Sequence, residues 1–233
     1  MTVWKELFCD SLFFGVAISL AGYQIGLMLK KKIKTALCNP LLISILLVIL
    51  FLVIFRVDYA SYKEGASYLS YLLTPATVCL AVPLYQQLEL LKKNWQAVFF
   101  SIAAGVLSSL GSIFLLAALF GFTHEQYVTL LPKSITTAIG IGVSEKLGGI
   151  VTVTVILIIL TGILGNVIAE GVFRLFRIRE PIAKGLALGT ASHAIGTAKA
   201  LELGEIEGAM SSLSIVVSGT LTVIAASFFA GFL

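Results

Sequence analysis

The segment Pro181–Gly204 combines ionisable groups with small residues in a chain that is otherwise strongly apolar. Lys184 stands near its start, His193 near its middle and Lys199 near its end. An ionisable side chain at the bilayer centre costs about 2.5–3.5 kcal/mol, so it is tolerated where it faces a bundle interior or a water-filled cavity. The residues between these groups are Gly185, Gly189, Thr190, Ser192, Gly196 and Thr197. Small residues let helices approach or break and present their backbone to a ligand, so we predict a binding site here, interrupted at Gly189 and Gly196.

The segment Leu130–Gly148 offers a second set of polar groups. Pro132 suits the first turn of a helix and is predicted to begin one. Lys133, Ser134, Thr136 and Thr137 then gather at the N-terminus of that helix. Free N–H groups, the helix dipole, hydroxyls and an ammonium together favour an anion. The alternative is that Lys133 extends to the outer interface and the hydroxyls only cap the helix.

His193 has two interpretations. Histidine titrates near neutral pH, which suits a proton relay or a contact with the substrate. The alternative is a buried, hydrogen-bonded packing residue. Ser192 is adjacent, but neighbouring helical positions point about 100° apart, so the two do not form a Ser–His dyad. The acids that follow, Glu202, Glu205 and Glu207, are predicted to form a solvated turn.

Motifs for catalysis or for a bound cofactor are missing from the sequence. It has no GxxxxGK[ST] and no HExxH, and its three cysteines show no CxxC spacing. We therefore expect no enzyme activity, no cofactor and no metal site. The net charge of +4 lies mostly beside apolar segments, so membrane lipid explains it better than nucleic acid does.

The elements that must position these groups are membrane helices. The 233 residues are 58% hydrophobic and 12% charged, and several runs approach the roughly 20 residues that cross a bilayer. We predict a single all-α integral membrane domain, residues 1–233. About five full spans are expected at Leu7–Leu29, Pro40–Arg56, Trp95–Gly121, Ile150–Phe173 and Ala209–Leu233. Three interrupted or re-entrant segments are expected at Ser67–Leu88, Leu130–Gly148 and Pro181–Leu203, with Pro75 and Pro83 breaking the first.

Charge predicts the orientation. The cluster at Lys30–Lys34 should be cytoplasmic. If Leu130–Gly148 dips into the membrane and returns, Arg174, Arg177 and Arg179 are cytoplasmic as well. Thr74–Leu84 and Gly189–Leu201 then form corresponding parts of an inverted repeat, as in many secondary transporters. A competing match pairs Pro75–Val82 with Pro132–Ile139, and the sequence leaves the choice between them open.

Four stretches resemble the LrgB/CidB family: LLTPATVCLAVPLYQQ (Leu72–Gln87), PKSITTAIGIGVSEKLGGI (Pro132–Ile150), LTGILG (Leu160–Gly165) and RIREPIAKGLALGTASHAIGTAKALELGEIEGAMSSL (Arg177–Leu213). The resemblance implies a multi-pass protein of the bacterial plasma membrane, often accompanied by a smaller LrgA/CidA-type partner. It further implies either control of murein hydrolases and autolysis in a holin/antiholin-like scheme, or movement of short carboxylates such as glycolate, glycerate or pyruvate, as in plastid relatives.

Interrupted polar helices favour the carrier over the holin-like assembly. In this hypothesis Lys133 neutralises the carboxylate, and hydroxyls from Ser134, Thr136, Thr137, Thr190, Ser192 and Thr197 bind its oxygens. His193 relays a proton or orients the anion, Lys199 completes the site, and the protein forms a homo-oligomer. The alternative is a membrane assembly protein that regulates murein hydrolases and has no transported substrate.

Overall fold

The computed structural model describes residue 11 and residues 13–33 and 39–233. About 87% of the described residues are helical, and no strand occurs among them. The chain divides into two compact units, residues 1–79 and 80–233. The first part of the predicted span Leu7–Leu29, together with Cys9, Cys38 and Lys34, lies outside the described residues.

The first unit contains α2 (Phe14–Ile33), α3 (Pro40–Phe55), α4 (Tyr59–Ser70) and α5 (Leu73–Cys79). α2 packs against α3 and α4. Gly22 and Gly26 permit the close approach to α3, because a Cβ at Gly22 would lie 3.1 Å from Ser44 Oγ and one at Gly26 would lie 2.8 Å from Pro40 Cα. α3 begins at Pro40 behind the N-cap Asn39 and ends at Phe55, before the C-cap Arg56, whose φ of 51° is left-handed.

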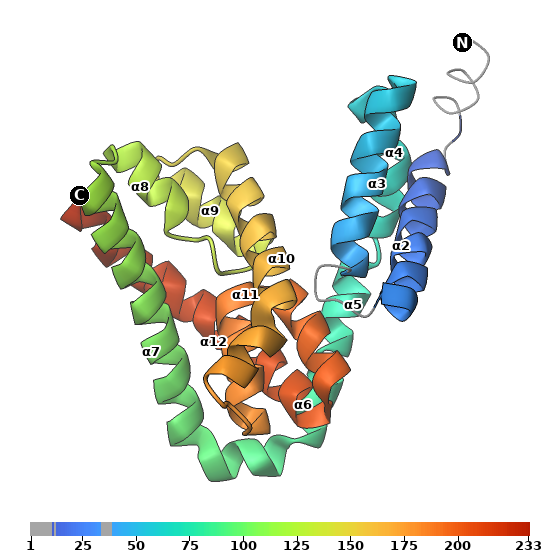
Figure 1. Ribbon diagram of the computed structural model, residues 1–233. Coiled ribbons are helices and arrows are strands. Elements are labelled where there is room, and N and C mark those ends of the chain that lie inside the picture. The colour runs from blue at the N-terminus through green and yellow to red at the C-terminus, as the bar shows by residue number, and fades with distance from the viewer. Residues whose placement is uncertain (1–10, 12, 34–38) are drawn as a thin grey trace. The chain divides into compact units, whose positions relative to one another are not determined.

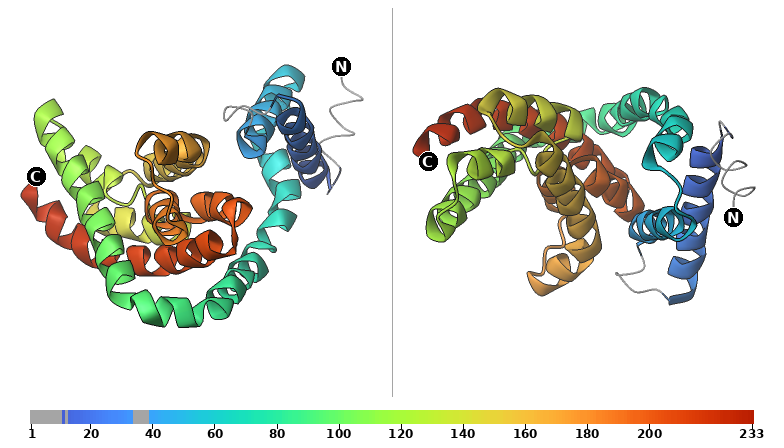
Figure 2. Two further views of the ribbon diagram at one scale, coloured as in Figure 1. Left: turned by 60° about the horizontal axis from the view of Figure 1, so that its bottom comes forward. Right: turned by 90° about the horizontal axis from the view of Figure 1, so that it is seen from above.

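The second unit contains the elements that position the site. They are α6 (Ala81–Gln86), α7 (Leu88–Phe120), α8 (His124–Leu130), α9 (Thr137–Leu147), α10 (Val151–Leu175), α11 (Pro181–Leu203), α12 (Glu205–Phe229) and the 3-10 turn η1 (Ala230–Phe232). α11 lies against α12, as the views in Figure 1 and Figure 2 agree. Gly185 and Gly189 make this contact possible, because a Cβ on either would collide with the backbone of Glu207 or Ser211. The small residues of this segment therefore permit close helix packing, one of the two roles considered for them.

Three described helices are long and apolar enough to cross a membrane: α7, α10 and α12 with η1. A fourth is possible if α4 to α6 counts as one bent span. These three correspond to three of the five predicted spans, and α7 bends at Asn94, next to the predicted start at Trp95. α3 is apolar but has only 16 residues. The structure thus supports three to four spans.

The prolines occupy helix beginnings. Pro75 and Pro83 are each the third residue of a short helix, α5 and α6, and Leu80 separates the two helices. A proline in a first turn removes no helical hydrogen bond, because the first N–H groups have no partner there. Pro132 was predicted in a first turn too, and this was wrong. It lies in the turn Leu131–Thr136 between α8 and α9, and α9 begins only at Thr137.

α11 is broken, but at a different residue from those predicted. His193 has φ 43° and ψ −136°, a left-handed conformation that costs a non-glycine residue about 1–3 kcal/mol. Gly189 instead packs against α12, and Gly196 makes room for Leu188 and Ser192 across the break. Two glycines of α10 receive the broken segment: a Cβ at Gly162 would lie 2.9 Å from the His193 ring, and one at Gly165 would collide with Ser192. The motif LTGILG therefore provides the space into which α11 breaks.

Candidate functional site

A cavity of about 470 Å³ lies among α7, the turn between α8 and α9, and the first half of α11. Its lining is made of small and hydroxyl-bearing residues with a single charged group: Ser101, Gly105, Ser108, Ser109, Ser112, Lys133, Ser134, Ala183, Leu186, Ala187, Thr190 and Ala191. The volume falls within the range of small-molecule sites. The lining can form hydrogen bonds with a polar ligand at many points and carries one fixed positive charge.

α7 contributes a polar face. Ser101, Gly105, Ser108, Ser109 and Ser112 follow one another at offsets of 4, 7, 8 and 11 residues, which places them on one side of a helix. Gly105 lets α11 approach, because a Cβ there would lie 2.9 Å from Thr190 Cγ2. This face lies within an apolar span and was not predicted, although the helical period of its serines is visible in the sequence.

Lys133 brings the charge. Its side chain is half-buried, and Nζ donates a hydrogen bond to Ser134 Oγ at 2.9 Å. Ser134 Oγ lies 3.3 Å from Ser109 Oγ, which connects the turn to α7. Among the residues that the structure describes, no carboxylate forms an ion pair with Lys133. A partly desolvated ammonium without a counter-ion is unfavourable, and an anionic ligand would relieve this cost.

Thr190 supplies an unused hydroxyl. Its Oγ1 is the one buried side-chain oxygen or nitrogen of the described residues that has no hydrogen-bond partner. An unsatisfied buried hydroxyl costs about 1–3 kcal/mol. Because Thr190 lines the cavity beside Gly105, a ligand oxygen there would satisfy it.

The cavity brings together three of the predicted binding residues, Lys133, Ser134 and Thr190. Thr136 and Thr137 lie half-buried at the start of α9 and do not line it. Pro83 belongs to α6, which packs on α12. Pro75 and the rest of α5 belong to the first unit.

Ser192, His193 and Thr197 lie at the break in α11, buried against neighbouring helices. His193 Nε2 is 3.0 Å from the carbonyl oxygen of Ile158 in α10. A carbonyl only accepts, so Nε2 carries the proton and donates. Thr197 Oγ1 donates to the His193 carbonyl at 3.0 Å and lies 2.8 Å from Ser211 Oγ of α12. This geometry matches the packing interpretation of His193, in which it secures α11 between α10 and α12.

Lys199 forms ion pairs with two glutamates. Its Nζ lies 2.6 Å from Glu170 and 3.3 Å from Glu202, and Glu170 also pairs with Arg174 at 3.1 Å. These residues join the second half of α11 to α10 and do not line the cavity. The prediction that Glu202, Glu205 and Glu207 form a solvated turn is wrong for Glu207, which is 8% exposed where α12 meets Gly185. No group of residues suited to a metal ion occurs in the described part of the chain.

The apolar helices, three of them long enough to cross a bilayer, define a multi-pass membrane protein. The chain belongs to the LrgB-like family, whose model matches residues 19–232. It is 40% identical over 207 residues to the holin-like protein CidB of Staphylococcus aureus strain Mu50, covering 89% of this chain and 90% of the relative. It is 37% identical over 222 residues to the antiholin-like protein LrgB of Bacillus cereus strain B4264, covering 95% and 96%. No solved structure matches the chain.

Proposed function

We propose that this protein is a secondary transporter of small organic anions, with carboxylates of the glycolate, glycerate or pyruvate type as substrates. The observation that carries the proposal is Lys133, a half-buried ammonium without an acidic partner in the described chain, which lines a cavity with an unsatisfied threonine hydroxyl. A site that only stabilised the fold would gain by pairing both groups.

The residues of the cavity suit a short hydroxy or keto acid. Lys133 neutralises the carboxylate, and Ser134 and Ser109 donate hydrogen bonds to its oxygens. The Thr190 hydroxyl, on the facing helix α11, forms a hydrogen bond with a further oxygen of the ligand. Lys133 Nζ and Ser134 Oγ, 2.9 Å apart, are the one lysine–serine pair in this lining, and in the proposal they bind the carboxylate and release it without chemical change.

The membrane arrangement that fits this role has α8, the turn and α9 as a re-entrant segment. Thr129 of α8 accepts from the Ile150 N–H at 2.8 Å, and Tyr127 donates to the Phe229 carbonyl at 2.8 Å. The start of α10 and the end of α12 therefore both lie beside α8, next to the end of α7 (Figure 1). Ser109 precedes the end of α7 by 11 residues, about 16 Å, so the turn reaches roughly half the hydrocarbon depth.

The labelling of introduced cysteines tests this arrangement. In a variant without native cysteines, Cys at Arg177 should react only from the cytoplasmic side and Cys at Glu125 only from outside. If the α8–α9 segment is re-entrant, α10 is the one helix that crosses the membrane between Glu125 and Arg177. The two positions then lie on opposite sides. Reaction of both positions from the same side would contradict the re-entrant assignment.

Packing between the interrupted helices and long helices supports the inverted repeat that pairs Thr74–Leu84 with Gly189–Leu201. α6 follows a break at Leu80 and packs against α12, whereas α11 contains a break at His193 and packs against α7. α6 thus lies against the long helix of the other half, whereas α11 lies against both α7 of the other half and, mainly, α12 of its own half. Such pairs of interrupted helices surround the substrate in many transporters.

The second candidate is a holin-like or antiholin-like assembly protein acting on murein hydrolases with an LrgA/CidA-type partner and without a transported substrate. The names of the relatives favour it. A pore would pass unrelated solutes without saturation, whereas a carrier saturates and shows competition. An effect on autolysis also follows indirectly from altered carboxylate flux, so that phenotype does not distinguish the two.

Uptake by proteoliposomes decides between them. We expect the purified protein to take up at least one radiolabelled C2–C4 monocarboxylate saturably, with competition by related acids and none by neutral sugars of similar size. The assay is run with and without a pH gradient, and again with the small membrane partner present. Non-saturable passage of all solutes, or saturable uptake of none in either preparation, would contradict the carrier.

A further inference from the structure

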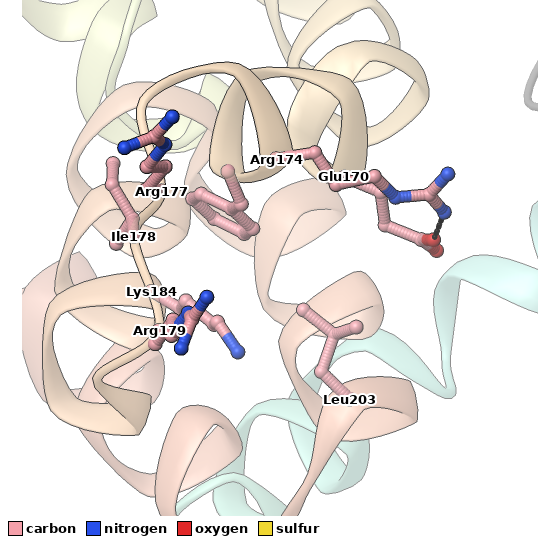
Figure 3. Close-up of a pocket in the computed structure, with 8 residues that line it drawn as sticks. Glu170, Arg174, Arg177, Ile178, Arg179, Lys184 and Leu203 are labelled. Atoms are coloured by element: carbon pink, nitrogen blue, oxygen red, sulfur yellow. Dashed lines mark hydrogen bonds and ion pairs between the residues drawn. The ribbon is translucent and has the colours of Figure 1, made fainter.

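A second cavity, of about 390 Å³, lies where α10 ends and α11 begins, and it is strongly basic (Figure 3). Its lining combines four cationic residues, one acid and an apolar group: Arg174, Arg177, Arg179, Lys184, Glu170, Phe173, Ile178 and Leu203. The single acid is already paired with Arg174 and Lys199. Within the described residues, Arg177, Arg179 and Lys184 form no ion pair, and Figure 3 joins only Arg174 to Glu170.

Arg177 occupies the cap that ends α10. α10 ends in a Schellman-type cap, in which Ile178 N–H bonds to the Phe173 carbonyl at 2.8 Å and Arg177 takes φ 55°. Glycine is favoured at that position because it has no Cβ to strain. Glycine would end the helix with less strain, and the arginine at this position places a guanidinium at the cavity.

The surroundings indicate a lipid rather than a soluble ion. Leu175 and Phe176, between the basic residues, are 76% and 69% exposed, as residues that face hydrocarbon are. Phe173, Ile178 and Leu203 form an apolar floor under the cations. Basic pockets beside apolar surface at helix ends suit a phosphate group that continues into acyl chains.

We propose that this cavity binds the phosphate of an anionic phospholipid. Arg177, Arg179 and Lys184 hold the phosphate oxygens, and the exposed apolar residues contact the upper part of the acyl chains. The site is separate from the serine-lined cavity and does not depend on the carrier function. Occupancy would link the end of α10 to the start of α11, the helix that carries Thr190.

The test uses the full-length protein in a neutral detergent, titrated with phosphatidylglycerol or with phosphatidylcholine of equal chain length and followed by native mass spectrometry. Arg177→Gly removes one charge and relieves the left-handed backbone, so the fold should be kept. We expect about fivefold weaker phosphatidylglycerol binding in this variant and in Arg179→Gln, and weak binding of phosphatidylcholine throughout.

Arg56→Gly is the matched control, because Arg56 is also an exposed arginine in a left-handed helix cap but lines no part of this cavity. It should bind phosphatidylglycerol like the parent. Equal binding by all three variants and the parent would overturn the proposal. Displacement of phosphatidylglycerol by millimolar inorganic phosphate, itself weakened by Arg177→Gly, would overturn the lipid as the occupant and assign the cavity to a soluble phosphate.

Discussion

Lys133→Met is expected to weaken the binding of a small carboxylate by about 5- to 150-fold while the protein remains folded and inserted. One ion pair at an effective dielectric near 20 has a gross Coulomb energy of about 4 kcal/mol, of which roughly 1–3 kcal/mol remains after desolvation. Methionine keeps much of the apolar length of lysine and removes its charge. The measurement is the initial rate of uptake at limiting substrate, together with the affinity of the purified protein.

The stability of the same variant gives a second readout. Lys133 forms one hydrogen bond, to Ser134, and no ion pair in the described chain. Removing an ammonium that is partly desolvated and lacks a counter-ion should leave the melting temperature in detergent unchanged or raise it. If Lys133 instead stabilised the fold, its replacement would lower the melting temperature.

Lys146→Met is the control, since Lys146 stands exposed in the last turn of α9, close in sequence to Lys133 but away from the serine-lined cavity. It removes the same charge and should transport like the parent. If Lys133→Met also transports like the parent at limiting substrate, Lys133 is not the anion's partner, whatever the protein carries.

The chemistry of the cavity was partly visible in the sequence. Lys133, Ser134 and Thr190 stand out because charge and hydroxyls are rare in an apolar chain. The α7 serines do not stand out in the same way, because a serine hydroxyl in a membrane helix can donate to a backbone carbonyl of the same helix. Ser112 does so to the Ser109 carbonyl. Only the arrangement of the helices distinguishes that use from a cavity face.

His193 illustrates the opposite limit. Its residue type favoured a proton relay or substrate contact, with packing as the alternative. The direction of its side chain depends on the left-handed backbone at the break in α11, which turns the ring toward Ile158 of α10. A break that falls on a histidine between two glycines is not encoded in any local preference, because propensity alone would place it on a glycine. The break instead coincides with the room that Gly162 and Gly165 of α10 leave for His193 and Ser192.

Thr190→Val is expected to lower carboxylate affinity by about tenfold or more and to leave stability unchanged or higher. The hydroxyl has no partner in the described protein, so valine, of nearly the same shape, removes an unsatisfied group without breaking a bond. A hydrogen bond to a charged ligand contributes about 1.5–3 kcal/mol, and this is what the variant loses. Affinity is measured with the same carboxylate as for Lys133→Met, and stability by thermal unfolding in detergent.

Thr197→Val should show the reverse pattern, which makes the pair decisive. Thr197 lies seven residues further along the chain, beyond the break at His193. It is fully buried, and its hydroxyl contacts both the His193 carbonyl and Ser211. Valine there leaves the Ser211 partner unsatisfied and should cost about 1–3 kcal/mol of stability, with affinity nearly unchanged in the protein that remains folded. Two chemically identical substitutions on one helix would then separate a ligand-binding hydroxyl from a structural one. If Thr190→Val instead melts lower and binds like the parent, its hydroxyl supports the fold and the proposed site loses one of its two central groups.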